Sequence, residues 1–128
     1  MAKGIIIREA HFPGRAQIDT YGNGGFRFAD MSHRGSLMLL PSGVHGWDLA
    51  EGDVLTVLSL QRVLDDAAQI EFLLVGTGKD LVRIPNDVKE ALRAAGIGSD
   101  PMSTGAAVRT YNVMLAEERA VAAVLMAV

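Results

Sequence analysis

The run Ile-Glu-Phe-Leu-Leu-Val-Gly-Thr-Gly-Lys at residues 70–79 decides the fold class of this chain. Its apolar part, Ile70 to Val75, is typical of a buried strand, and glycines end it. Pro85-Asn86-Asp87 then opens a helix, because proline is well tolerated in a first helical turn. The apolar stripe of this helix is Val88, Ala91, Leu92 and Ala95, and Gly96 ends it. A buried strand followed by an amphipathic helix predicts a βαβ unit.

The same alternation continues to the end of the sequence. Residues 97–103 predict a short strand, and Thr104 is placed to cap a third helix. Val108, Tyr111 and Leu115 lie on one face of that helix. A last strand is expected from Arg119 onward, so the second half of the chain predicts parallel strands joined by helices.

The first half is more extended. Alternation over residues 16–21 and 26–28, around the glycines of residues 22–25, predicts a hairpin. A turn is expected at residues 33–35, followed by a strand buried on both faces from Ser36 to Leu40. A first helix is expected from Ser59, its cap, with Leu60, Val63, Leu64 and Ala67 on one face.

These elements predict a single α/β domain over residues 1–128. We expect three layers: a central mixed, mostly parallel sheet, helices packed on it and an N-terminal antiparallel hairpin. A chain of 128 residues that is 49% hydrophobic and 21% charged is long enough to bury one core. Six or seven strands and three helices are expected.

Composition excludes several classes of site and partner. The chain has no cysteine, which removes disulfides, thiolate metal sites and cysteine nucleophiles. Its formal net charge is −3 and its twelve Lys and Arg are scattered, so we expect no nucleic-acid partner. The apolar run at residues 5–7 is too short for a signal peptide, and the apolar segment at 121–128 is too short to span a membrane. A cytoplasmic location, with membrane association only through a partner, is expected.

No residue pattern predicts a catalytic set, a metal site or a cofactor. His11, His33 and His45 form no His-x-His or His-Glu-x-x-His motif. Ser42, Ser59 and Ser103 lack a Gly-x-Ser-x-Gly context. The adjacent carboxylates at 65–66 and 117–118 do not face each other on a helix. This pattern favours a non-enzymatic protein, and we expect a monomer or a weak dimer.

A candidate ligand site is predicted at the end of the strand at residues 70–75. Backbone amides of Gly76, Thr77 and Gly78, with Lys79, could hold an anion at the carboxyl edge of a parallel sheet. The spacing fits neither a P-loop nor a dinucleotide fingerprint, and a purely structural turn is the alternative. Arg109 and Asn112, one turn apart on the third helix, could complete the pocket. Alternatively, Arg109 could pair with a carboxylate such as Asp100, and Asn112 could cap a loop.

A candidate partner surface is predicted at residues 41–48, which the proline and glycines favour as a loop. This segment carries His45 and Trp47, and Trp47 is the only tryptophan. Tryptophan is enriched at binding hot spots, although a lone tryptophan can equally cover the core. With Tyr111, these residues are the candidate partner contacts.

Three motifs in order resemble a known family. They are Gly76-Thr77-Gly78-Lys79; Gly96-Ile97 with Asp100-Pro101-Met102-Ser103-Thr104; and Ala107-x-Arg109-Thr110-Tyr111-Asn112 with Glu118-Arg119 and Val121-Ala122-Ala123. From about Ile18 to Leu125 the chain resembles the small-domain family that includes mitochondrial complex I assembly factor three, the adipogenesis-associated domain protein and many bacterial and archaeal proteins.

The resemblance implies a three-layer fold with a central mixed sheet and helices on one side. It also implies a protein-binding role with assembly proteins or membrane-complex subunits as partners, because the mitochondrial members act in that way. The leading hypothesis is therefore an accessory protein for assembly of a respiratory or membrane complex. The alternative is a binder of a small anionic ligand, or an enzyme, that uses a pocket at the strand ends.

Overall fold

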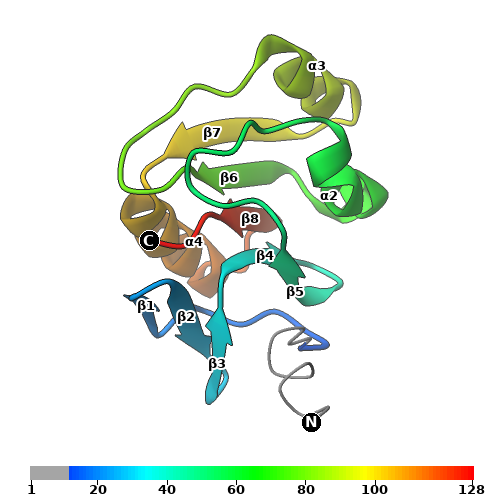
Figure 1. Ribbon diagram of the computed structural model, residues 1–128. Helices are drawn as coiled ribbons and strands as arrows, with labels where there is room; N and C mark the ends of the chain where they lie inside the picture. The colour runs from blue at the N-terminus through cyan, green and yellow to red at the C-terminus, as the bar shows by residue number, and fades with distance from the viewer. Residues whose placement is uncertain (1–11) are drawn as a thin grey trace, which may run out of the picture.

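The computed structural model describes residues 12–128, so His11 and the apolar run at residues 5–7 lie outside the described part. Within this part the chain forms eight strands, three α-helices and two 3₁₀ turns (Figure 1). The strands are β1 (Thr20–Gly22), β2 (Gly25–Phe28), β3 (Met31–Arg34), β4 (Ser36–Leu40), β5 (Gly43–Trp47), β6 (Phe72–Gly76), β7 (Gly98–Met102) and β8 (Val121–Leu125). The helices are α2 (Gln61–Asp65), α3 (Asn86–Ala94) and α4 (Thr104–Ala116), and the 3₁₀ turns are η1 (Leu58–Leu60) and η2 (Ala67–Gln69).

Five strands form the central sheet, in the order β5-β4-β8-β6-β7, which Figure 1 shows from bottom to top. The pairs β6–β7 and β6–β8 are parallel, whereas β4–β5 and β4–β8 are antiparallel. The predicted mixed α/β fold class is confirmed. The strand pairs of the central sheet divide equally between the two orientations, because β4 and β5 are joined as a hairpin and β4 inserts against β8.

Helices cover both faces of this sheet. The chain passes from β6 through α3 to its neighbour β7, and then through α4 back past β6 to β8. Because crossovers of this kind are right-handed, two that run in opposite directions across a sheet place their helices on opposite faces. The expectation of helices on one side is therefore wrong.

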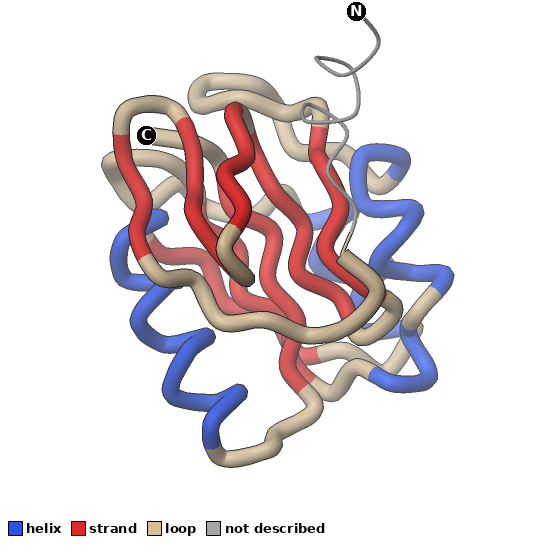
Figure 2. The backbone as a smooth tube through the Cα atoms, turned by 90° about the horizontal axis from the view of Figure 1, so that it is seen from below, coloured by secondary structure: helices blue, strands red, loops and turns tan. Residues whose placement is uncertain are grey.

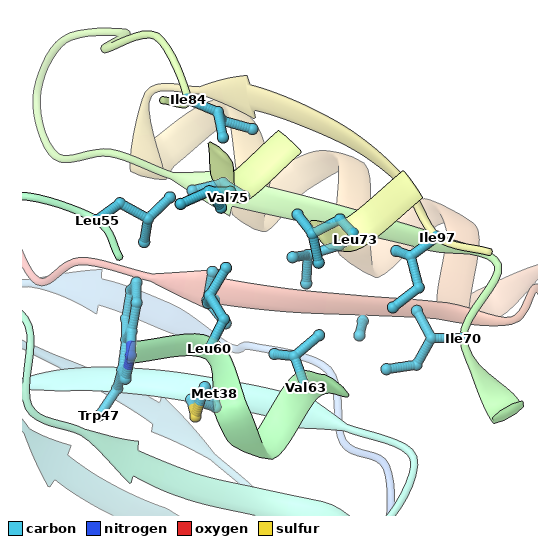
Figure 3. Close-up of a cluster of buried hydrophobic side chains, with 14 of the residues drawn as sticks. Met38, Trp47, Leu55, Leu60, Val63, Ile70, Leu73, Val75, Ile84 and Ile97 are labelled. Atoms are coloured by element: carbon cyan, nitrogen blue, oxygen red, sulfur yellow. The ribbon is translucent and has the colours of Figure 1, made fainter. Parts of the chain in front are cut away.

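Adjacent residues of β6 show the two faces. Leu73 belongs to a cluster with Val88 and Leu92 of α3, and Leu74 belongs to a cluster with Val108 of α4. All five are buried. In Figure 3, Leu60 and Val63 of the segment that includes α2 lie together with Leu73 and Val75 in the first cluster.

A second sheet, β1-β2-β3, is antiparallel throughout and packs beside α4 (Figure 2). Its Phe26 and Phe28 are buried against Leu37 and Leu39 of β4. Gly35, with φ of +99°, turns the chain from β3 into β4. The predicted hairpin thus gains a third strand, because the expected turn at residues 33–35 is a bend at one glycine.

The prediction of a loop over residues 41–48 is wrong, because Gly43–Trp47 is strand β5. It pairs with β4 along its whole length, from Leu40 opposite Gly43 to Ser36 opposite Trp47. Pro41 and Ser42 form a two-residue hairpin connection, the commonest length for antiparallel neighbours. The turn residues therefore mark a tight turn between two strands and not an extended loop.

Neither predicted helix cap holds. Ser59 lies in η1, where its hydroxyl donates to the carbonyl oxygen of Thr56 at 2.6 Å, and α2 begins two residues later. Thr104 is the first residue of α4, and Ser103 caps it by accepting from the amide of Ala106 at 3.4 Å. The Thr104 hydroxyl can therefore form hydrogen bonds with backbone groups at the ends of the neighbouring strands.

Candidate functional site at the carboxyl edge of the parallel strands

The carboxyl ends of β6 and β8 meet the start of α4 through one threonine. The Thr104 hydroxyl donates to the carbonyl oxygen of Met126 at 2.7 Å and accepts from the amide of Gly78 at 3.0 Å. Its own amide donates to the Gly78 carbonyl oxygen at 2.8 Å. Gly76 permits this approach, since a Cβ there would lie 3.1 Å from Thr104 Cα. The first turn of α4 is thus fixed to the turn after β6.

Thr77 organises the turn from the inside. Its hydroxyl donates to the carbonyl oxygen of Asp80 at 2.7 Å and accepts from the amide of Val82 at 2.9 Å. Its amide donates to the carbonyl oxygen of Met102 at 2.9 Å. A side-chain hydroxyl that bonds nearby backbone groups stabilises a compact turn without regular secondary structure.

The glycine turn already holds a carboxylate. The amide of Lys79 donates to Glu51 Oε2 at 2.6 Å, and Gly78, with φ of +105°, leaves the space that the Glu51 side chain fills. The structure buries Gly76, Thr77 and Gly78 and exposes Lys79. One amide of this turn, that of Lys79, therefore binds an anionic group, as backbone amides can, but the group belongs to the chain itself. An external anion at this point remains a prediction, and it would have to displace Glu51.

A groove of about 280 Å³ opens beside this turn, between the segments at 52–55 and 82–85. Buried Leu55, Ile84 and Met126 contribute to its lining. Val54 and Val82 line it as well, and their side chains are 73% and 58% exposed. The groove therefore has buried apolar side chains inside and exposed apolar side chains at its edge.

Two charged residues lie at the groove. The Asp53 carboxylate accepts from the amide of Ala50 at 2.8 Å, which closes a local turn. Arg83 is exposed and makes no hydrogen bond or ion pair with any residue of the described part. Within the described residues the groove is thus bordered by one carboxylate and one guanidinium group, and neither forms an ion pair.

Asn112 and Arg109 do not join this site. The Asn112 side chain forms a double hydrogen bond with Ile18, donating to its carbonyl oxygen at 2.8 Å and accepting from its amide at 2.9 Å. It lies eight residues beyond Thr104, about 12 Å along the helix at a rise of about 1.5 Å per residue. Arg109 is exposed and forms no ion pair within residues 12–128, with Asp100 or any other group. A pocket that joins them to the glycine turn therefore remains a prediction, and a ligand there would have to span this separation.

The candidate partner residues lie in different environments. Trp47 is 9% exposed and donates from Nε1 to the carbonyl oxygen of Ser59 at 2.9 Å, and Tyr111 is 1% exposed. Both side chains therefore belong to the core, Trp47 on the α2 side and Tyr111 on the α4 side. His45 is half-buried, with Nε2 3.4 Å from the Ser42 hydroxyl. His45 is thus partly accessible to a partner, and Trp47 lines an open hollow with Leu58, whereas Tyr111 is enclosed.

Burial shifts the pKa of two side chains. It lowers the pKa of His33, and the hydrogen bond between Nε2 and the carbonyl oxygen of Ser36 at 3.0 Å opposes this in part. Nδ1 of His33 is buried without a partner in the described structure. Burial also raises the pKa of Tyr111 to about 12, and the charge of Arg15 opposes that shift. Neither residue belongs to the groove.

The sequence patterns did not predict the residues of the groove. Val54-Leu55 and Leu81-Val82 are apolar pairs inside segments without helical or strand periodicity. Loops are usually polar, so apolar pairs within loop-like segments are the sequence signal that could have identified these residues. Within residues 12–128, no group of three or more His, Asp and Glu is placed to hold a metal ion. None of the helices in that range is long and apolar enough to cross a membrane.

Known proteins are similar to this chain in sequence and in fold. An uncharacterized protein of Rhodobacter capsulatus is 39% identical over 119 residues, which cover 93% of this chain and 90% of that protein. The mouse NADH dehydrogenase [ubiquinone] 1 alpha subcomplex assembly factor 3 is 30% identical over 122 residues, covering 95% of this chain and 66% of that protein. The crystal structure of a Bartonella henselae protein described as an outer membrane protein superposes with a TM-score of 0.87 at 60% identity. That match covers 91% of this chain and 98% of the other.

The family model described as "Protein of unknown function (DUF498/DUF598)" matches residues 18–126. The match spans both sheets, α2, α3 and α4, and it includes the glycine turn and the groove. The chain therefore belongs to the DUF498/DUF598 family.

Proposed function

We propose that this protein is a non-enzymatic accessory factor that binds a subunit or assembly protein of a respiratory or other membrane complex. The bound element is an apolar segment of the partner, and it docks in the groove between residues 52–55 and 82–85. The observation that carries this proposal is the gathering of exposed apolar side chains at that groove.

Two of the six exposed large hydrophobic side chains among the described residues, Val54 and Val82, belong to the two segments that form the groove. Val54 and Val82 line the groove directly, and Leu81 is adjacent to Val82 in the chain. Contiguous exposed apolar surface of this kind marks interaction sites on soluble domains, whereas isolated apolar residues do not.

The exposed arginine at the edge of the groove indicates which chemical groups a partner segment would carry. Arg83 makes no hydrogen bond or ion pair within the described part of the chain. A partner segment with one carboxylate beside its apolar residues would satisfy Arg83 when the groove is covered. The partner is thus an apolar segment that carries an acidic residue.

The relatives support the choice of complex. The mouse relative is named as an assembly factor of the NADH dehydrogenase [ubiquinone] 1 alpha subcomplex. We extend that role to this chain, acting as a monomer in the cytoplasm and reaching a membrane through its partner. Cell fractionation with and without the partner tests this location, since loss of the partner should release the protein from the membrane fraction.

The first test is a quantitative affinity capture from the native host under gentle membrane solubilisation. We compare the wild type with Val82→Gln and Val54→Gln, and with Val113→Gln as the matched control. Val113 and Val82 are both 58% exposed, but Val113 lies on α4 outside the groove. Burial of an apolar side chain of this size is worth about 1.5–3 kcal/mol, so each groove variant should weaken binding about tenfold or more.

Recovery of NADH dehydrogenase subunits or their assembly proteins by the wild type and by Val113→Gln, with loss in both groove variants, is the expected result. Equal recovery by all four proteins would reject the groove as the docking surface. Recovery of no subunit or assembly protein of a membrane complex by the wild type would reject the proposed function.

A further inference from the structure

The outward face of the three-stranded sheet carries a second hollow, distinct from the groove. Residues opposite one another on antiparallel strands share a face of the sheet. Tyr21, Phe26 and His33 are such a row, and Phe26 and His33 are buried, so this row faces the core. The neighbouring rows therefore face away from the core. They are Thr20-Arg27-Ser32 and Gly22-Gly25-Arg34.

The two glycines create the hollow. Gly22 and Gly25 lie opposite each other and present no side chain beside Arg34. Gly25 cannot be replaced cheaply, because a Cβ there would collide with the carbonyl oxygen of His33. The open volume of about 540 Å³ over this face is within the range of small-molecule sites.

The side chains around the hollow are donors. Arg27 Nη1 donates to the Ser32 hydroxyl at 3.3 Å, and Arg34 makes no hydrogen bond or ion pair with any described residue. The two arginines are diagonal neighbours across β2 and β3, a separation of about 7–8 Å that long side chains bridge. Thr20 adds a hydroxyl, and no aspartate or glutamate lines the hollow.

We propose that this face binds a phosphate group, as a small organic phosphate or a phosphorylated lipid headgroup. A guanidinium binds a phosphate through two parallel hydrogen bonds. A single arginine can saturate a carboxylate, whereas a phosphate offers three oxygens to two guanidinium groups and a hydroxyl. This site lies outside the apolar groove and does not depend on the proposed partner.

The experiment is an amide NMR titration of the full chain with inorganic phosphate and with glycerol 3-phosphate, at fixed pH and ionic strength. Co-sedimentation with phosphatidylcholine vesicles, with and without phosphatidylglycerol, separates a headgroup from a free phosphate. The variants are Arg27→Gln and Arg34→Gln, and Arg93→Gln is the charge-matched control. Arg93 lies on α3, outside the three-stranded sheet, and its guanidinium group pairs with the Glu90 carboxylate at 3.2 Å.

We expect saturable shifts at residues 20–34 with one of the phosphate probes, or vesicle binding that requires phosphatidylglycerol. Arg27→Gln or Arg34→Gln should each weaken that binding about tenfold, the usual effect of losing a charged hydrogen bond, and Arg93→Gln should not. The amide spectrum of each variant shows at once whether it is folded. The proposal is overturned if no probe binds at residues 20–34, or if Arg93→Gln weakens binding as much as the other two.

Discussion

Thr104 is the residue on which the carboxyl edge of the sheet most depends. It is fully buried, and its hydroxyl serves the Gly78 amide and the Met126 carbonyl oxygen. Substitution to valine keeps the volume but leaves both backbone groups without a partner. A buried polar group left unpaired costs about 1–3 kcal/mol.

We predict that Thr104→Val lowers the free energy of unfolding by about 2–6 kcal/mol, from two such groups. Thr104→Ser keeps the hydroxyl and should cost less than Thr104→Val. Urea denaturation of the three proteins measures both differences. Equal losses in the two variants would show that the methyl group, and not the hydroxyl, matters.

His33 makes stability depend on pH. Its pKa in the folded chain lies below the ordinary value of 6.5 because burial disfavours the charged ring. Between these two values the unfolded chain binds a proton that the folded chain does not. Stability is therefore highest above about pH 6.5 and falls as the pH drops through this window, by at most about 1.4 kcal/mol per pH unit for one group.

The matched variant for this prediction is His33→Gln. Glutamine can donate to the Ser36 carbonyl oxygen as His33 Nε2 does, but it does not titrate. The free energy of unfolding, measured by urea denaturation from pH 5 to pH 8, should change less steeply with pH in His33→Gln than in the wild type. An identical pH dependence of the free energy of unfolding in both proteins would assign the acid sensitivity to other groups.

Asn112 attaches the segment before β1 to helix α4. Its amide closes a two-hydrogen-bond ring with the backbone of Ile18, which is 94 residues away in the chain. Asn112→Ala removes both bonds, but it removes no side chain of either hydrophobic cluster, since Asn112 itself belongs to neither. We predict faster hydrogen exchange at Ile18 and Asp19 with little change in the protection of β6 and β8.

The neighbouring substitution Arg109→Ala is the control for that measurement, because Arg109 is exposed and makes no contact of this kind in the described structure. It should leave exchange at Ile18 unchanged. Slower or unaltered exchange at Ile18 in Asn112→Ala would contradict the role given to the double hydrogen bond.

Local patterns predicted the elements that have one clear periodicity. The strand at 72–76 and the helix at 86–94 follow from an apolar run, a proline start and a helical stripe. Strand β5 could not be found in this way, because its glycines and histidine carry no alternating apolar pattern and its pairing with β4 holds it in place. Caps were misassigned at Ser59 and Thr104 since hydroxyls have several possible backbone partners.

The candidate site also combines a feature that local sequence predicts with features that depend on segments distant in the chain. The position of the turn at 76–79 follows from the chain order, as a strand end at the carboxyl edge of a parallel pair. The occupation of that turn by Glu51 depends on a segment about 28 residues away that no local pattern connects to it. The groove likewise depends on two segments that meet only in the folded chain.

The two hydrophobic clusters lie on opposite faces of one sheet, and this arrangement predicts cooperative unfolding of the whole molecule. Leu73 and Leu74 are both fully buried, one in each cluster. Leu73→Ala and Leu74→Ala should each lower stability by about 2–5 kcal/mol. The single tryptophan, Trp47, lies in the cluster of Leu73 and reports on that face alone.

For a single domain, Leu74→Ala should lower the midpoint of tryptophan fluorescence as much as that of far-ultraviolet circular dichroism. A fluorescence midpoint unchanged from the wild type, with a lower circular dichroism midpoint, would show that the two faces unfold separately.

At the scale of the whole molecule, we propose that the groove between residues 52–55 and 82–85 binds a partner during assembly of a membrane complex. The most direct test is deletion of the protein from a respiring host, followed by complementation and quantification of intact NADH dehydrogenase and its assembly intermediates on native gels. We predict loss of the intact complex on deletion, recovery with the wild type and with Val113→Gln, and little recovery with the Val54→Gln/Val82→Gln double variant. Unchanged amounts of the complex and its intermediates in the deletion strain would contradict the claim.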